Sequence, residues 1–253
     1  MFRQIFGNIP DVTKNLLILN VLFFLAKIVL MNQGIDLNTM LSMHYPFSNV
    51  FEPYQVITHF FMHGDLMHIL FNMIGLVVFG SMLERFWGKK RYFIFYVVTA
   101  LGGAILYEAV QMYELYQLVG SINPDITITD IQSLPNGMTS WNWNSKVKFV
   151  SEEQVLLYRE ASAYYARGSL GASGAVYGLI LGVGYLFPNT EFLLYFTFKV
   201  KAKWIAIALG VFALYQGFQN NPGDSVAHMA HLGGMLFGFI MIKVWQRNKN
   251  TFY

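Results

Sequence analysis

Cysteine is absent from this 253-residue chain, and charged side chains are scarce. The absence of cysteine excludes disulfide bonds, thiolate zinc sites and cysteine nucleophiles. Charged residues are 12% of the chain, about half of the roughly 25% usual in soluble domains. A net charge of +3 is too small to indicate binding to nucleic acid. Apolar residues instead make up 55% of the chain, which indicates a protein that crosses a membrane several times.

Apolar runs long enough for the ~30 Å hydrocarbon core of a bilayer occur six times. They predict spans at about 16–32, 66–83, 92–110, 171–187, 203–219 and 229–245. The expected fold is an all-α membrane protein, a six-transmembrane-helix bundle in one domain over residues 1–253. The first run follows Arg3 and Lys14 without a small-residue cleavage site, so we expect it to be a signal anchor.

The basic residues between these runs are distributed unevenly. The predicted inner side carries twelve basic and three acidic residues, whereas the other side carries four basic and eleven acidic residues. Lys27 is the one basic residue well inside a span. Because basic loops stay in the cytoplasm, this bias predicts a multi-pass protein of the cell (inner) membrane with both termini cytoplasmic.

Two predicted outer segments are long. Residues 33–65, between the first two spans, are rich in aromatic residues, so we expect a partly buried loop at the membrane interface. Residues 111–168 form an outer insertion between the third and fourth spans. Its composition predicts turns at 123–125, 135–137 and 141–143 and a short helix at 152–165.

Polar side chains inside a span are expensive and therefore indicate function. Those found away from the span ends are His68, Asn72, Ser173, Tyr177 and His231. His68 and Asn72 are four residues apart, as are Ser173 and Tyr177, so each pair shares one face of its helix.

Ser173 lies in Gly171-Ala172-Ser173-Gly174, where a loop turns into a helix. The first-turn amides of a helix lack intrahelical partners, so a serine there could attack a carbonyl while amides hold the oxyanion. The alternative is that these small residues, which continue as Gly178 and Gly182, serve only close helix packing.

His231 is the candidate base for Ser173. Gly234 and Gly238 follow it on the same helix, and this glycine face would allow close contact with the fourth span. Such contact would bring imidazole and hydroxyl together, as nucleophilic catalysis requires. His228, three residues earlier, is a competing base, and a histidine bonded only to a carbonyl is the alternative without catalysis.

No span supplies a buried carboxylate to orient this imidazole. Asp65 and Asp224 lie at loop positions, and Glu108 lies near the end of the third span. A dyad is therefore expected rather than a Ser-His-Asp triad, with the ring of Tyr177 packed on the imidazole.

The histidines also allow a metal site as an alternative. His59, His63 and His68, together with His228 and His231, could form a zinc or haem site, since histidines at i and i+4 can share a metal. No carboxylate accompanies them within a span and no HExxH motif is present. We therefore expect no metal and no cofactor, and structural hydrogen bonds for His59 and His63.

Three sequence pieces together resemble the rhomboid family of intramembrane serine proteases, in its bacterial, six-span type. They are His63-Gly-Asp-Leu-Met-His68-Ile-Leu-Phe-Asn72, Gly171-Ala-Ser173-Gly174-Ala-Val-Tyr177 and Ala230-His231-Leu-Gly-Gly234-Met-Leu-Phe-Gly238. The resemblance implies Ser173 as nucleophile, His231 as base, and an oxyanion hole of His68, Asn72 and the Ser173 amide. It also implies a shortened fourth helix, a water-filled cavity open to the outer side, and single-pass membrane proteins as substrates.

The sequence departs from the family pattern in places. Tyr54-Gln55 stands where many members have Trp-Arg, Glu84 and Arg85 are adjacent without a spacer, and 111–168 is long. Phe212, Tyr215 and Phe218 on the fifth span, facing the second, are candidates for a lateral gate. The other function classes are a catalytically silent relative that binds membrane-protein clients, and a metal-dependent membrane hydrolase or transporter.

Overall fold

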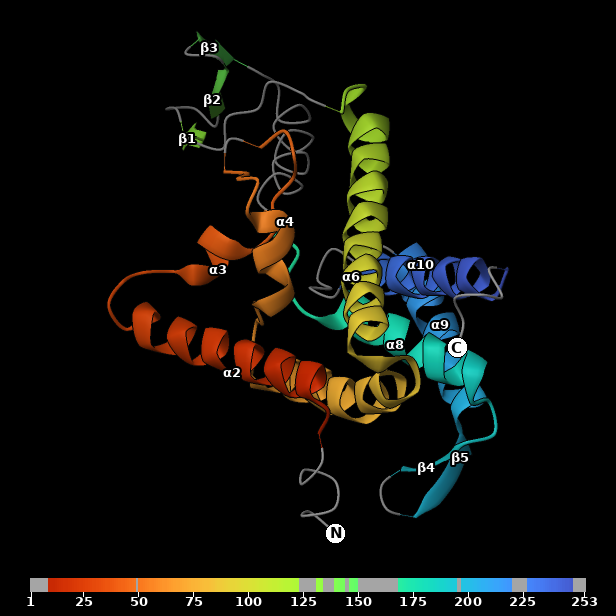
Figure 1. Cartoon of the computed structure of the whole chain (residues 1–253). Coiled ribbons are helices and arrows are strands. Elements are labelled where there is room, and N and C mark those ends of the chain that lie inside the picture. The colour runs from red at the N-terminus through yellow and green to blue at the C-terminus, as the bar shows by residue number, and fades with distance from the viewer. Residues whose placement is uncertain are drawn as a thin grey trace.

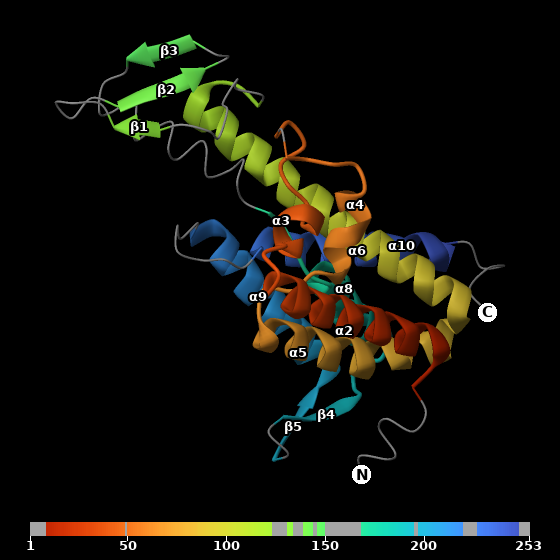
Figure 2. The same ribbon diagram turned by 90° about the vertical axis from the view of Figure 1, so that its left-hand side faces the viewer.

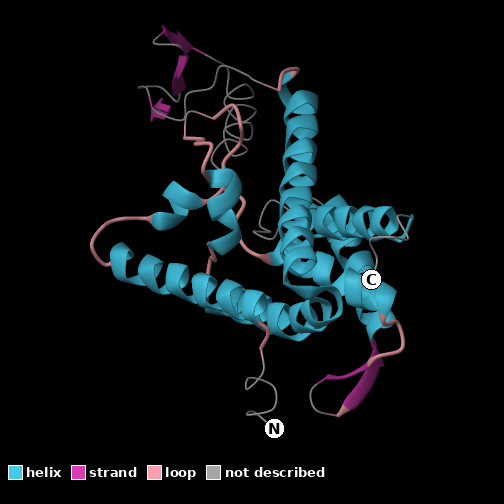
Figure 3. Cartoon of the chain, viewed as in Figure 1, coloured by secondary structure: helices cyan, strands magenta, loops and turns pink. Residues whose placement is uncertain are grey.

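The structure is a computed structural model that describes residues 9–48, 50–122, 131–133, 139–143, 146–149, 168–194, 197–219 and 227–247. The described chain is mostly helical (Figures 1 and 3). The long helices are α2 (Asp11–Met31), α5 (Leu66–Gly75), α6 (Ser81–Val119), α8 (Ser173–Leu186), α9 (Ala202–Gln219) and α10 (His228–Arg247). They cover the six apolar segments identified in the sequence. The loop 33–65 contains α3 (Leu37–Leu41), α4 (Gln55–Thr58) and the 3₁₀ turn η1 (His59–Phe61).

Among the described residues, two helical stretches are long and apolar enough to cross a membrane. One is α2, and the other is the continuous helical stretch from Leu66 to Val119. The helix α8 is apolar but has 14 residues.

The second and third apolar segments are joined without a loop. A π-helical turn, η2 (Leu76–Gly80), links α5 to α6, and α6 itself bends sharply at Gly88. Gly88 has φ 76° and ψ 168°, a conformation that side chains disfavour and glycine tolerates. Figure 1 shows the chain turning upward there into the long part of α6. α6 also continues to Val119, beyond the predicted end at 110, so the first part of the predicted insertion is helical.

Five short strands were not predicted. β1 (Ile131–Ser133), β2 (Thr139–Trp143) and β3 (Lys146–Phe149) form an antiparallel sheet in that order. The turn predicted at 141–143 is therefore wrong, because these residues pair with β1 and β3; tryptophan favours strands. The helix predicted at 152–165 lies outside the described residues. β4 (Glu191–Leu194) and β5 (Phe198–Lys201) form a hairpin between α8 and α9.

The helix α8 lies at the centre of the bundle, against α5, α6, α9 and α10 (Figures 1 and 2). Glycines make these contacts close. A Cβ on Gly234 of α10 would lie 1.9 Å from the carbonyl oxygen of Gly174 on α8, and one on Gly103 of α6 would lie 2.7 Å from the carbonyl oxygen of Ala230. The backbones of α6, α8 and α10 thus meet directly, and this contact fixes how the polar residues of α8 and α10 face each other.

The first helix α2 is attached to this bundle by polar groups. The carboxylate of Glu84 on α6 accepts hydrogen bonds from the amides of Val12 and Thr13 and from the Thr13 hydroxyl, at 2.8–2.9 Å. These amides belong to the first turn of α2, where donors lack intrahelical partners. Glu84 therefore caps α2 from another helix.

Candidate active site

The hydroxyl of Ser173 and the imidazole of His231 form a hydrogen bond between α8 and α10. Nε2 of His231 lies 2.9 Å from Oγ of Ser173. Ser173 is the first residue of α8, and His231 is buried in the first turn of α10. The pair joins residues 58 positions apart, through the close approach at Gly174 and Gly234.

Tyr177 lies one turn after Ser173 and packs on the imidazole. The Tyr177 and His231 rings are stacked, with centroids 4.0 Å apart and planes 8° apart. A ring in this position restricts rotation of the imidazole, so Nε2 remains directed at the hydroxyl. The ring of His228 meets that of His231 edge-on, at 5.7 Å, and also meets Phe212 of α9 edge-on.

The segment before Ser173 is held in place by the loop 33–65. Ser169 exchanges two backbone hydrogen bonds with Met43, at 2.8 and 2.9 Å, and the Gly171 amide donates to the carbonyl oxygen of His59 at 2.8 Å. Gly171 has φ 118°, which again favours glycine. The loop is well packed: Tyr45, Phe60, Met62 and His63 are buried, while Phe47 and Tyr54 are exposed.

His68 reaches the same segment from α5. A Cβ on Gly171 would lie 2.8 Å from Nε2 of His68, so this ring nitrogen lies beside the loop that leads to Ser173. Asn72, one turn later, is buried, and its side-chain amide donates to the carbonyl oxygen of His68 at 3.0 Å. The structure thus brings Ser173, His231, Tyr177, Gly171 and His68 into one region, and a role for Asn72 at an oxyanion stays a prediction.

His59 and His63 are buried structural groups. Nδ1 of His59 is 2.7 Å from the carbonyl oxygen of Gln55, and the ring of His63 meets that of His68 at 5.0 Å. Burial lowers the pKa of His59 to about 4, and burial together with the charge of His68 lowers that of His63 to about 3. In the described part of the chain no group of three or more histidine and acidic side chains is placed to hold a metal ion.

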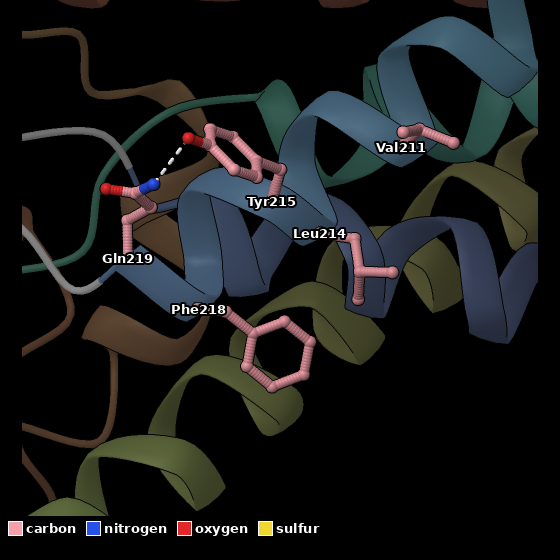
Figure 4. Close-up of a pocket in the computed structure, with 5 residues that line it drawn as sticks. All are labelled: Val211, Leu214, Tyr215, Phe218 and Gln219. Atoms are coloured by element: carbon pink, nitrogen blue, oxygen red, sulfur yellow. Dashed lines mark hydrogen bonds between the residues drawn. The ribbon is translucent and has the colours of Figure 1, made fainter.

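The aromatic residues considered as a gate lie on an exposed face of α9. Phe212, Tyr215 and Phe218 are each more than half exposed, and α9 packs mainly on α8 and α10. Tyr215 and Phe218, with Val211, Leu214 and Gln219, line an open pocket of about 450 Å³ (Figure 4). Gln219 donates a hydrogen bond to the Tyr215 hydroxyl there.

Two structural contributions were missed in the sequence. Gly102 and Gly103 of α6 face α10 so closely that a Cβ on either would overlap Phe237 or Ala230; adjacent glycines inside an apolar run were the available signal. Lys27 was noted only as a basic residue in a span, although it bonds to the loop before α5.

Comparison with known proteins finds one family, the same one that the sequence motifs resemble. The model of the rhomboid domain family matches residues 50–121 and 149–248, more than half of the chain. An uncharacterized mitochondrial rhomboid protein of Schizosaccharomyces pombe is 29% identical over 215 residues, which is 76% of this chain and 51% of that protein. The mitochondrial RHOMBOID-like protein 12 of Arabidopsis thaliana is 29% identical over 227 residues, 88% of this chain and 55% of that protein.

A bacterial protein is also similar over a shorter stretch. Rhomboid protease GlpG of Haemophilus influenzae is 34% identical over 91 residues, 35% of this chain and 45% of GlpG. The chain thus spans about half the length of the curated relatives it matches. These relatives include mitochondrial and bacterial proteins, so the similarity does not single out the bacterial type.

Proposed function

The chain belongs to the rhomboid family, a membrane-embedded family known for intramembrane serine proteases, and we propose that it is an intramembrane serine endopeptidase using Ser173 and His231. The observation that carries the proposal is the 2.9 Å contact between the Ser173 hydroxyl and Nε2 of His231. A serine hydroxyl is a weak nucleophile by itself, and an adjacent base activates it.

The proposed reaction begins when Oγ of Ser173 attacks the carbonyl carbon of a peptide bond. His231 accepts the hydroxyl proton as the bond to Oγ forms, and the carbonyl π electrons move onto the oxygen. When the tetrahedral intermediate collapses, the C–N bond breaks and His231 donates that proton to the departing amine. Water then hydrolyses the acyl-serine by the same steps, and Ser173 recovers its proton.

The negative oxygen of the intermediate requires hydrogen-bond donors. The amides in the first turn of α8 point toward its N-terminal end, where the helix dipole also favours negative charge. Nε2 of His68 lies beside Gly171 at this end. We propose these groups, with Asn72, as the oxyanion hole; each such donor is worth about 10²–10³ in kcat.

We propose single-pass membrane proteins as substrates, cut in or near the transmembrane helix. We propose six spans, with both termini in the cytoplasm and the site opening to the outer side. The six apolar helical segments and the uneven distribution of basic residues support this arrangement. The apolar pocket on α9 suits contact with a substrate helix, because its walls include Val211, Leu214 and Phe218.

Labelling with a fluorophosphonate tests the proposal without a known substrate. An activated serine attacks phosphorus and displaces fluoride, so we expect wild-type protein in detergent to be labelled and Ser173→Ala to remain unlabelled. A folded wild type without labelling, in detergent and after return to lipid bilayers, would contradict the protease proposal and favour a silent, client-binding relative.

A further inference from the structure

Lys27 is a buried cation on the side of α2 that faces the bundle. The buried residues of α2 are Thr13, Leu16, Asn20 and Lys27, which recur at helical spacing and so form one stripe. Three of the four are polar, whereas the rest of the helix is largely exposed and apolar. Lys27 is 6% exposed, and a cation in such a place needs specific partners.

Its partners are two consecutive carbonyl groups in the loop before α5. Nζ of Lys27 donates to the carbonyl oxygen of His63 at 2.7 Å and to that of Gly64 at 2.6 Å. The ammonium also lies 5.6 Å from the centre of the Phe24 ring. Hydrogen bonds from a charged donor are shorter and roughly twice as strong as neutral ones, so Lys27 fixes the orientation of this loop.

The peptide group between His63 and Gly64 connects Lys27 to His68 by hydrogen bonds at both of its ends. In a trans peptide the C=O and N–H bonds point in opposite directions. With its oxygen on Lys27, this peptide directs the Gly64 amide to the other side, where it donates to Nδ1 of His68 at 3.3 Å. A chain of hydrogen bonds therefore runs from the ammonium through one peptide group to the imidazole, and such chains strengthen each bond.

This chain determines which nitrogen of neutral His68 carries the proton. Because Nδ1 accepts a hydrogen bond, the proton of the neutral ring resides on Nε2. Nε2 is the nitrogen beside Gly171, in the segment that leads to Ser173. Asp65, which caps the N-terminus of α5, also positions His68, since its carboxylate accepts a hydrogen bond from the His68 backbone amide at 2.8 Å.

We propose that Lys27 is a positioning residue that orients the His63–Gly64 peptide, so that His68 presents Nε2–H as a donor to the oxyanion. This inference rests on the proposed function, because it assigns Lys27 a task in the same reaction. Lys27 does not touch the reacting atoms and acts through Gly64 and His68. Figure 2 shows the placement this requires, with α2 alongside α5.

The test compares Lys27→Met, which keeps a similar length and removes the donors, with Lys27→Arg, which retains charged donors. Turnover of a transmembrane-segment peptide is measured with the proteins in lipid bilayers. We expect Lys27→Met to lower kcat by about 10- to 100-fold with KM nearly unchanged, since an oxyanion donor acts in the transition state. Lys27→Arg should recover part of that loss.

The matched control is Asn20→Leu, on the same buried stripe of α2. Its side-chain amide donates to the carbonyl oxygen of Leu16 within the same helix, at 2.7 Å, and not to the described loop before α5. Asn20→Leu should therefore keep kcat. A loss of kcat equal to that of Lys27→Met would reduce Lys27 to a general role in attaching α2 and would overturn the proposal.

A second readout is independent of catalysis and of the folding of any variant. The ¹⁵N shifts of His68 in the wild-type protein report which ring nitrogen is protonated. We expect the Nε2–H form, and finding the Nδ1–H form would overturn the inference directly. A wild type that shows this tautomer but no Ser173-dependent labelling would instead contradict the proposed function alone.

Discussion

At the scale of single residues, the candidate site depends on which imidazole contacts Ser173. His231 and His228 are three residues apart on α10, and their rings touch. The stacked Tyr177 ring and the 2.9 Å contact both belong to His231. His228 is instead packed edge-on against Phe212, so its ring has a second neighbour on α9.

Substitution of the two histidines separates their roles. His231→Ala should lower kcat by about 10⁴-fold or more, because His231 is the base that contacts the Ser173 hydroxyl. His228→Ala should lower it by less than about 10-fold, through looser packing beside the base. Initial rates on a transmembrane-segment peptide measure both, and substantial turnover by His231→Ala with none by His228→Ala would assign the base role to His228.

Part of this site could be predicted from the sequence, because helical spacing and glycine faces are local properties. Ser173 at the start of a helix, and Tyr177 one turn later, follow from the chain itself. The contacts of Lys27 could not be predicted in the same way. They depend on where the backbone of residues 63 and 64 passes, and a loop path is not encoded in any periodic pattern.

At the scale of helices, the site is assembled by the glycine contacts among α6, α8 and α10. A side chain at Gly234 would meet the backbone of Gly174 at 1.9 Å, and a backbone carbonyl cannot rotate away as a side chain can. The short distance between α8 and α10 therefore requires glycine at position 234. That distance also determines whether His231 reaches Ser173.

Gly234→Ala should accordingly separate the two helices. We expect a destabilisation of about 1–3 kcal/mol, typical of overpacking, together with loss of most activity. Gly210→Ala on α9 is the control, since its added Cβ would meet only the flexible side chain of Met235 at 3.4 Å. Thermal unfolding and peptide turnover measure the two effects, and equal behaviour of both variants would contradict this account.

Helix positions were predictable from apolar runs, but the connections between helices were not. Gly88 permits a sharp bend in place of a loop, and 141–143 belongs to a strand although its composition suggested a turn. One unusual backbone conformation determines the structure in the first case, and pairing with the two neighbouring strands determines it in the second. Composition within a short window contains neither piece of information.

At the scale of the whole molecule, the loop 33–65 couples folding to pH through its buried histidines. Burial keeps His59 neutral in the folded protein and lowers its pKa from 6.5 to about 4. The unfolded chain therefore binds a proton below pH 6.5 that the folded chain does not bind until about pH 4. The contribution of His59 to the free energy of unfolding should be complete above pH 6.5 and decrease as pH falls toward 4.

His59→Gln removes this titration and should make stability less dependent on pH in that window. Thermal unfolding in detergent, recorded from pH 7.5 to 4, measures the dependence. The variant starts less stable, because the hydrogen bond to Gln55 changes, but its unfolding temperature should fall less steeply with acidification. An unchanged slope would show that His59 does not contribute to acid sensitivity.

The length of α8 has a consequence for where a substrate would be cut. Its 14 residues span about 21 Å, about 9 Å less than the ~30 Å hydrocarbon layer. In the proposed topology the C-terminal end of α8, at Leu186, lies at the inner boundary, so Ser173 at its first residue lies about 9 Å below the outer one. A substrate helix alongside rises 1.5 Å per residue, so the serine faces a bond about six residues inside its outer end. The length of α8 would then determine how far inside the membrane a substrate helix is cut.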